Sequence, residues 1–222
     1  SGTSISFGSA AVFENAAIGS TLSATYDSTN QKVVIAYRDA GNSNYGTAIV
    51  GTVSGTSISF GAAAVFESAA CDYFSATFDS SANKVVIAYR DEGNADYGTA
   101  VVGTVSGTSI SFGTPVVFAD SFSFHFSSTY DSTNQKVVIV YRDLGNSSYG
   151  TAVVGTVSGT SISFGTPVVF ETASSDYNSA IFDPNNNKIV IAYQDSGNSG
   201  YGTVIIGTVS GTSIRFGTAK IF

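Results

Sequence analysis

The sequence predicts an all-β domain, a four-bladed β-propeller of four-stranded antiparallel blades, because one strand-rich unit recurs and no stretch has helical periodicity. The phrase SGTSISFG begins at Ser1, Ser54, Ser106 and Ser158, and the variant SGTSIRFG begins at Ser210. These spacings of 53, 52, 52 and 52 residues are typical of propellers, solenoids and repeat arrays. We expect residues 1–222 to form one propeller domain, with part of a larger propeller or repeat array as the alternative.

Each repeat is expected to supply four strands, ordered from the centre of the ring to its edge. In the first repeat, the short strand SATYD ends at Asp27, and the strand KVVIAYRD follows at residues 32–39. The third strand spans residues 45–53, and a fourth strand follows the turn SGTS. The predicted blades lie at about residues 20–66, 73–118, 125–170 and 177–222.

The residue patterns indicate where each strand lies in its blade. Val33–Tyr37 form a continuous apolar run, which is typical of a strand covered on both faces. The fourth strand carries Pro115 and Pro167, which favour an outer edge because proline lacks the N–H group that a sheet ladder needs. The first strand is rich in Ser and Thr, whose small side chains suit the crowded centre of a ring.

The chain holds one more copy of the fourth strand than a closed ring of four blades needs. We expect residues 1–13 to form this extra outer strand and to help close the ring. One interpretation divides each fourth strand into two halves near Gly8, so that each terminus supplies half of the closing blade; the other is a segment of a longer array. Arg215 and Lys220 in the last copy favour a true edge there, since charges on an edge strand prevent further pairing.

Composition excludes several classes of protein. The net charge is −7 and the 9 basic residues are spread along the chain, so no basic cluster exists for nucleic acid. No apolar run approaches the roughly 20 residues of a membrane span, so membrane insertion is not expected. Cys71 is the single cysteine, expected as a small buried apolar residue, and carboxylates are sparse. We therefore expect no disulfide, no metal ion and no cofactor.

The segment Asp39–Tyr45 recurs in every repeat, beginning again at Asp91, Asp143 and Asp195. It resembles the Asp-box of sialidase-type propellers, in which Asp, Gly and an aromatic residue build a tight β-hairpin. Here the aromatic residue is Tyr rather than Trp and falls one residue late. The resemblance implies a structural role, with the Asp side chain accepting hydrogen bonds from its own hairpin. Gly41 and Asn42 are expected to adopt positive φ.

Variation between the copies concentrates at one end of the predicted blades. In an antiparallel meander, the loops after strands one and three share one face, and the loops after strands two and four share the other. The loops after strands one and three barely change between repeats. The loops that join strand four to the next strand one vary and read ENAAIGSTLS, ESAACDYFS, ADSFSFHFS and ETASSDYNS. The two–three loops vary at Ala40, Glu92, Leu144 and Ser196, and at Asn44, Asp96, Ser148 and Gly200. We predict a recognition surface on this face; general tolerance of loops to change is the alternative.

Aromatic and acidic side chains in these variable segments are the candidate ligand contacts, because aromatic rings stack on sugars and carboxylates accept hydrogen bonds from hydroxyl groups. The candidates are Tyr73, Tyr177, His125, Phe124, Asp72 and Asp176. His125 takes the place of Tyr73 and Tyr177 in its own repeat and is interpreted as a surface aromatic rather than a catalytic base. Leu22, Phe74 and Phe126 have a structural alternative, a plug in the centre of the ring.

Three further candidates are Arg38, Arg90 and Arg142, which end the second strand in three repeats and are replaced by Gln194 in the fourth. Guanidinium groups that converge on one face would clamp a carboxylate, as a sialidase requires. The alternative is that each arginine forms an ion pair between blades.

These patterns favour a non-enzymatic recognition module for carbohydrates or cell surfaces. Catalysis has little support, because acid and base roles need dissimilar residues, whereas the polar residues at the strand ends repeat almost unchanged. Richness in Ser, Thr, Gly and Tyr with few Lys resembles bacterial and phage adhesin repeats, which implies adhesion and a secreted, cell-surface or virion-surface location. The second hypothesis is a structural building block of a filament or surface array, with self-association through an edge strand. A glycosidase is the third.

Overall fold

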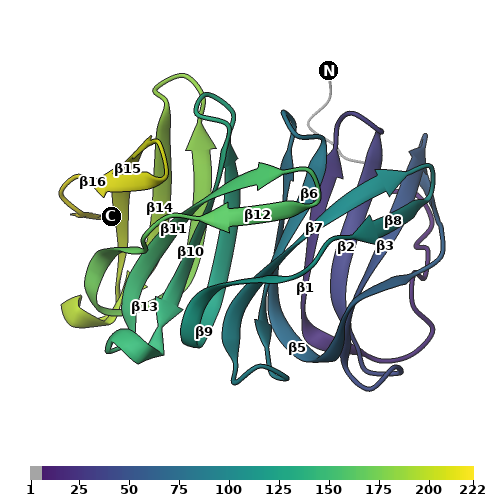
Figure 1. The fold of residues 1–222 in the computed structure, drawn as a ribbon, viewed down its shortest axis with the longest axis horizontal. Helices are drawn as coiled ribbons and strands as arrows, with labels where there is room; N and C mark the ends of the chain where they lie inside the picture. Colours follow the sequence, from purple (N-terminus) through teal and green to yellow (C-terminus); the bar gives the residue numbers. More distant parts are fainter. Residues whose placement is uncertain (1–6) are drawn as a thin grey trace.

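A computed structural model describes residues 7–222, which form four antiparallel sheets side by side (Figure 1). The first sheet contains β1 (Ile18–Asp27), β2 (Lys32–Asp39), β3 (Tyr45–Ser54) and β4 (Ser57–Phe60). The second begins with β5 (Ala64–Asp79), β6 (Lys84–Asp91), β7 (Tyr97–Ser106) and β8 (Ser109–Phe112). The third begins with β9 (Val116–Asp131), β10 (Lys136–Asp143), β11 (Tyr149–Ser158) and β12 (Ser161–Phe164). The fourth contains β13 (Val168–Asp183), β14 (Lys188–Asp195), β15 (Tyr201–Ser210), β16 (Ser213–Phe216) and β17 (Lys220–Ile221).

Helix is almost absent from this part of the chain. Two short 3₁₀ helices, η1 (Leu144–Asn146) and η2 (Ser196–Asn198), lie in the hairpins of the third and fourth sheets. Within residues 7–222, no helix has the length and apolar character needed to cross a membrane.

The strands β5, β9 and β13 each run for 16 residues and belong to two sheets. In β5, the first half pairs with β3, from Ala64 opposite Ala48 to Ala70 opposite Tyr45. The second half pairs with β6, from Cys71 opposite Asp91 to Asp79 opposite Lys84. The prediction of a variable loop before a separate short inner strand was therefore wrong. The chain passes from the edge of one sheet to the centre of the next in extended conformation.

The outer strand is divided into two halves, as one of the two interpretations required. β4 pairs with the C-terminal half of β3, and the start of β5 pairs with its N-terminal half. The break falls at Gly61, where an added Cβ would lie 1.9 Å from the carbonyl oxygen of Thr108 in the next sheet. Only glycine fits such a close approach of two backbones. Pro115 and Pro167 lie in the equivalent gaps before β9 and β13, where no ladder donor is required.

Neighbouring sheets pack face to face through apolar side chains. Between the first and second sheets, Val34 and Ala48 meet Ile87 and Val101, and all four are fully buried. Equivalent residues fill the next two interfaces. The first strands of neighbouring sheets lie side by side, and hydroxyl groups join them: Ser75 Oγ lies 2.9 Å from Ser128 Oγ.

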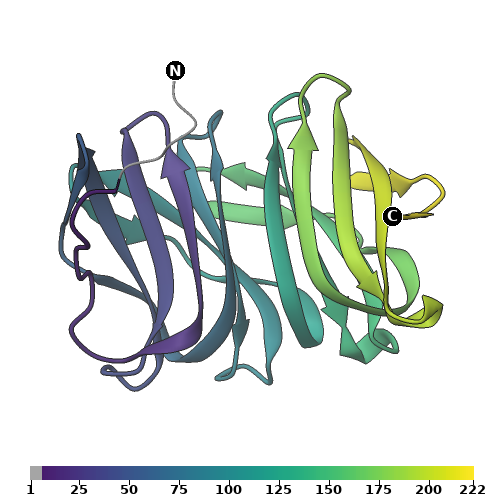
Figure 2. The same ribbon diagram turned by 180° about the vertical axis from the view of Figure 1, so that it is seen from behind.

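The sheets follow an open arc, and the predicted closed ring of four blades is not formed. The first and fourth sheets lie at opposite ends of the molecule (Figures 1 and 2), and within residues 7–222 no strand pairing joins them. Of the extra outer strand predicted at residues 1–13, residues 1–6 lie outside the described part, and residues 7–17 form no strand. Phe13 instead packs on Tyr37 of the first sheet, with ring centroids 5.2 Å apart, and β17 occupies the edge of β15.

In the hairpin between β2 and β3, positive φ occurs at other residues than those predicted. Positive φ occurs at Ser43 (56°) and Asn44 (63°), not at Gly41 and Asn42. Gly41 is needed for space, since a Cβ there would lie 2.4 Å from the Cβ of Ala16. The backbone N–H of Asn42 donates to Asp39 Oδ1 at 3.1 Å, so the aspartate holds its own hairpin as the Asp-box resemblance implied.

Candidate functional site

Each inner strand carries a β-bulge near the end of the sheet that also bears the variable hairpins. The register shifts between Asp72 and Ser75, and at the equivalent points of the other inner strands. Tyr73, His125 and Tyr177 occupy equivalent bulge positions, with φ of 55°, 56° and 52°. Residues other than glycine seldom adopt such angles, and bulges characteristically redirect a side chain out of the strand pattern. We call this end of the sheets the rim.

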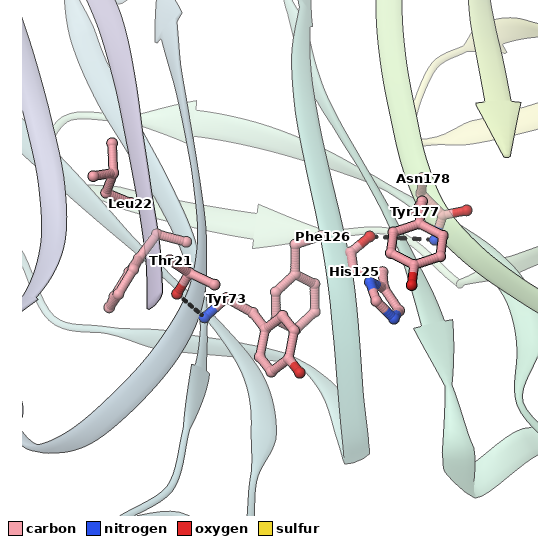
Figure 3. A pocket seen from close by; sticks show the side chains of 8 residues that line it. Thr21, Leu22, Tyr73, His125, Phe126, Tyr177 and Asn178 are labelled. Atoms are coloured by element: carbon pink, nitrogen blue, oxygen red, sulfur yellow. Dashed lines mark hydrogen bonds between the residues drawn. The ribbon is translucent and has the colours of Figure 1, made fainter. Parts of the chain in front are cut away.

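A hollow of about 460 Å³ lies where the four bulges meet (Figure 3). Its lining comprises two consecutive residues from each inner strand: Thr21, Leu22, Tyr73, Phe74, His125, Phe126, Tyr177 and Asn178. The volume falls within the range typical of small-molecule sites. The hollow therefore gathers three of the predicted contacts, from strands separated by about fifty residues each.

The three residues for which a plug in the centre of the ring was the alternative differ in burial. Phe74 and Phe126 are 7% and 8% exposed, and each packs edge-on against a core phenylalanine, Phe66 or Phe118. They form the wall of the hollow while belonging to the cores between sheets. Leu22 is 49% exposed, because no sheet precedes the first one.

A row of aromatic rings runs along the rim beside the hollow. Tyr73 lies 5.6 Å from Phe124 and 5.8 Å from His125, measured between ring centroids. His125 lies 5.2 Å from Tyr177, and Phe122 extends the row through Phe124 at 5.0 Å. The structure thus brings together all four predicted aromatic contacts.

The predicted arginines are paired with carboxylates of the protein, and two of the three share one carboxylate. Arg38 Nη1 donates to Glu92 Oε1 of the next sheet at 2.8 Å, and Arg90 Nη2 donates to the same oxygen at 2.9 Å. Arg142 Nη1 donates to Asp176 Oδ1 at 2.5 Å, across the interface between the third and fourth sheets. Arg38 and Arg142 thus form ion pairs between sheets. Glu92 was not among the predicted contacts, although its position was recognised as variable between repeats.

Two arginines also lie over aromatic rings of the row. The guanidinium carbon of Arg90 is 5.0 Å from the centre of the Tyr73 ring, and that of Arg142 is 5.3 Å from the centre of the Phe124 ring. Such cation–π contacts fix the guanidinium plane and the ring together. The rim therefore presents apolar ring faces whose polar neighbours are already oriented.

Asp72 is held by hydrogen bonds from the bulge residues themselves. Asp72 Oδ1 accepts a hydrogen bond from the backbone N–H of Tyr73 at 2.8 Å and another from the hydroxyl of Thr21. Thr21 Oγ1 in turn accepts from the N–H of Tyr73 at 2.9 Å, a bond drawn in Figure 3. These bonds link the first two inner strands at the edge of the hollow.

His125 is held neutral by its surroundings. Burial lowers the pKa of the imidazole below its ordinary value of 6.5, the nearby charge of Arg142 lowers it further, and Asp176 opposes both. His125 Nε2 lies 3.3 Å from Asp176 Oδ1, which also accepts from Arg142. At neutral pH the imidazole therefore offers a polar, uncharged aromatic surface to the hollow.

The remaining reactive groups lie in the core. Cys71 is fully buried between the first two sheets, and burial raises the pKa of its thiol, as expected for a small apolar core residue. Over the described range 7–222, no group of three or more His, Cys, Asp or Glu side chains is placed to hold a metal ion.

Comparison with known proteins supports the fold. No family model and no curated protein sequence matches this chain. Among solved structures, a mutant of Aleuria aurantia lectin in complex with alpha-methyl-L-fucoside is similar, with a TM-score of 0.51 and 13% sequence identity. The match covers 85% of this chain and 56% of the lectin chain. At this identity it shows a shared fold, an all-β arrangement of the lectin-propeller kind, and this chain spans just over half of the lectin.

Proposed function

We propose that this protein is a non-enzymatic recognition module that binds a carbohydrate at the rim hollow. The observation that carries the proposal is the row of aromatic rings from Tyr73 to Tyr177 along a hollow of about 460 Å³, with fixed Asp–Arg pairs beside it. Sugar rings present apolar C–H faces that stack on aromatic rings, and hydroxyl groups that exchange hydrogen bonds with carboxylates and guanidinium groups. Both kinds of partner are present here within one small region.

The structural similarity to a lectin supports the same function at the level of the fold. The solved lectin holds a fucoside, so this type of sheet arrangement is compatible with sugar binding. We further propose that the four sheets are propeller blades and that the protein acts in adhesion at a cell or virion surface, or after secretion.

Binding to a glycan array, followed by calorimetry with the best sugar, tests the proposal. Tyr73→Ala and Tyr177→Ala are each expected to weaken binding about tenfold, which corresponds to about 1.4 kcal/mol. Tyr26→Ala is the matched control, because Tyr26 is an exposed tyrosine, 55% accessible, near the opposite end of an inner strand. Sugar binding that survives the double replacement of Tyr73 and Tyr177 would contradict the proposed site.

Turnover must also be measured on the same sugar. We expect the bound sugar to be recovered unchanged, because glycoside hydrolysis needs a proton donor, whereas burial disfavours the protonated form of the single histidine and its neighbour Asp176 is paired with Arg142. Release of product from a fluorogenic glycoside, abolished by His125→Phe, would show that the site is catalytic.

A further inference from the structure

The three interfaces between sheets are copies of one apolar interface. In the first copy, Val34, Ala36, Ala48 and Val50 on one sheet meet Val85, Ile87, Val101 and Ile110 on the next. All eight side chains are at most 6% exposed. Equivalent residues make the second and third copies, so each sheet has one face for its predecessor and another for its successor.

The first sheet leaves part of its predecessor face exposed to solvent: Val33 and Ile35, the counterparts of Val85 and Ile87, are half-buried, whereas Ile49, the counterpart of Val101, is buried. Val53 and Ile58 are the counterparts of Val105 and Ile110 by their place in the repeat. Val53 is 55% exposed, whereas Val105 is 7% exposed beneath the first sheet. The first sheet therefore carries a half of the repeated interface that is covered only in part, by the segment in which Gly8 approaches Thr56 as Gly61 approaches Thr108.

The fourth sheet presents the other half. Its Val190, Ala192, Val204 and Ile206 are the counterparts of Val34, Ala36, Ala48 and Val50. Ile206 is 40% exposed, whereas Val50 is fully buried. The two ends of the arc thus hold the two complementary halves of a fourth copy of the interface.

The free face of the fourth sheet is more apolar than its buried counterparts. Ile181 stands where the other inner strands have Thr25, Thr77 and Thr129, and it is 65% exposed. Val204 replaces an alanine, and Ile206 replaces a valine. Apolar side chains on a sheet face that stays in water are not stabilised by burial, and a large exposed apolar patch marks an interaction surface.

The charges of the two free faces also fit each other. Arg38, Arg90 and Arg142 give way to Gln194 in the fourth sheet. The position of Glu92, which pairs with Arg38 across the first interface, is Ala40 in the first sheet. At this end of the strands, joining the fourth sheet to a first sheet therefore leaves no unpaired arginine or glutamate, where a buried lone charge would be costly. Arg215, an exposed residue opposite Thr208, also lies on the free face of the fourth sheet, at the other end of the strands.

We propose that the free face of the fourth sheet binds the free face of the first sheet in a second copy of this chain, head to tail. Two such contacts join two copies into a ring of eight sheets, at the upper end of the usual range of about four to eight blades. If the rotation does not close, the same contact propagates as a filament. The junction places Thr21 and Leu22 of one copy beside Tyr177 and Asn178 of the other, which extends the wall of the hollow.

Two segments compete for one position at such a junction. Phe13 packs on Tyr37 as Phe66 packs on Tyr89, and Phe222 occupies the corresponding place beside Gly202 at the end of the fourth sheet. Only one of them fits between a fourth and a first sheet. β17 is attached to β15 by only two residue pairs, so we expect Lys220–Phe222 to give way to Phe13 of the other copy.

Light scattering after gel filtration tests this contact, whether or not a sugar binds. We expect the 22.8 kDa chain to reach twice its mass, or higher multiples, as concentration rises. Ile206→Asp and Val53→Asp, one on each free face, are each expected to return it to a monomer without lowering its melting temperature. The matched control is Val117→Asp, because Val117 is also 40% exposed but lies on the outer edge of the second sheet.

Mixing the two monomeric variants gives the decisive result. Each variant retains one intact face, so a head-to-tail contact predicts that the mixture forms pairs with one junction. Association of like faces predicts instead that at least one of the two variants still dimerises on its own through its intact face, which would overturn the proposal. A wild-type chain that stays monomeric at every concentration would also overturn it and would assign the free faces to another partner or to further repeats.

Discussion

The two ends of the inner strands differ in how far the four repeats share the same side chains. At the end away from the rim, every inner strand finishes with an aspartate, Asp27, Asp79, Asp131 or Asp183, and each following turn of four residues ends at a lysine. At the rim, the equivalent positions hold three kinds of side chain, Thr21, Tyr73, His125 and Tyr177, and the last three share a positive φ. The same repeat therefore keeps its residues at one end and changes them at the other.

The difference follows from what each side chain does. Asp131 Oδ1 accepts from the backbone N–H groups of Thr133 at 3.0 Å and Asn134 at 2.9 Å, so the carboxylate is part of the turn. At the bulge, the fold requires only a backbone conformation, and the side chain is directed into the hollow. Variation between repeats thus separates residues that build the sheets from residues free to contact a ligand.

Among changes at the two ends of the inner strands, the largest effect is expected at the end away from the rim. Asp131 is 1% exposed and also accepts from the side-chain amide of Asn134 at 2.8 Å. Asp131→Ala leaves these donors without a partner and is expected to lower the free energy of unfolding by about 3 kcal/mol in urea titration. Asp183→Ala is the matched control, because Asp183 makes the equivalent bonds in an exposed turn. Equal losses for the two variants would show that burial of the carboxylate is unimportant.

A smaller effect is expected from the ion pair at the rim. Asp176→Ala removes the acceptor of Arg142, and both side chains are partly exposed, so we expect a loss of about 1 kcal/mol. Arg142→Gln copies the residue that the fourth sheet has at Gln194. In a double-mutant cycle, the combined variant should lose less than the sum of the single variants. Strict additivity would mean that the pair contributes nothing to stability.

Replacing Tyr177 tests whether a rim side chain contributes to sugar binding without contributing to stability. Its side chain is 73% exposed, so Tyr177→Ala is expected to change the free energy of unfolding by less than about 0.5 kcal/mol while weakening sugar binding. Tyr141→Ala is the contrasting change, since Tyr141 is 1% exposed in the core and its loss is expected to cost about 3 kcal/mol or more. Similar melting temperatures for both variants would contradict this division.

The smallest expected effect concerns pH. Because the pKa of His125 is lowered by burial, the folded protein takes up this proton less readily than the unfolded chain does. The free energy of unfolding should therefore decrease as the pH falls from neutral through the ordinary histidine range and below it. His125→Phe should remove that part of the decrease in urea titrations at several pH values. An unchanged pH profile in the variant would assign the decrease to carboxylates.

The sequence by itself determined the features that depend on neighbouring residues. The strand at residues 32–39 is observed as predicted, and the third strand differs by one residue at its end. Pattern and turn chemistry within ten residues fix such strands, because alternation and turn acceptors act locally. Comparison of the copies also identified Tyr73, His125 and Tyr177 as candidates, and the structure brings them together at one hollow.

Only the tertiary structure decided how the repeats join. Whether a strand stops or continues from one sheet into the next depends on contacts such as that of Gly61 with Thr108, which lie 47 positions apart in the sequence. The open arc, the bulges and the partnership of Arg38 with Glu92 likewise arise between sheets. A repeat specifies its own strands and both of its faces, but the number of sheets that close a ring depends on how those faces stack.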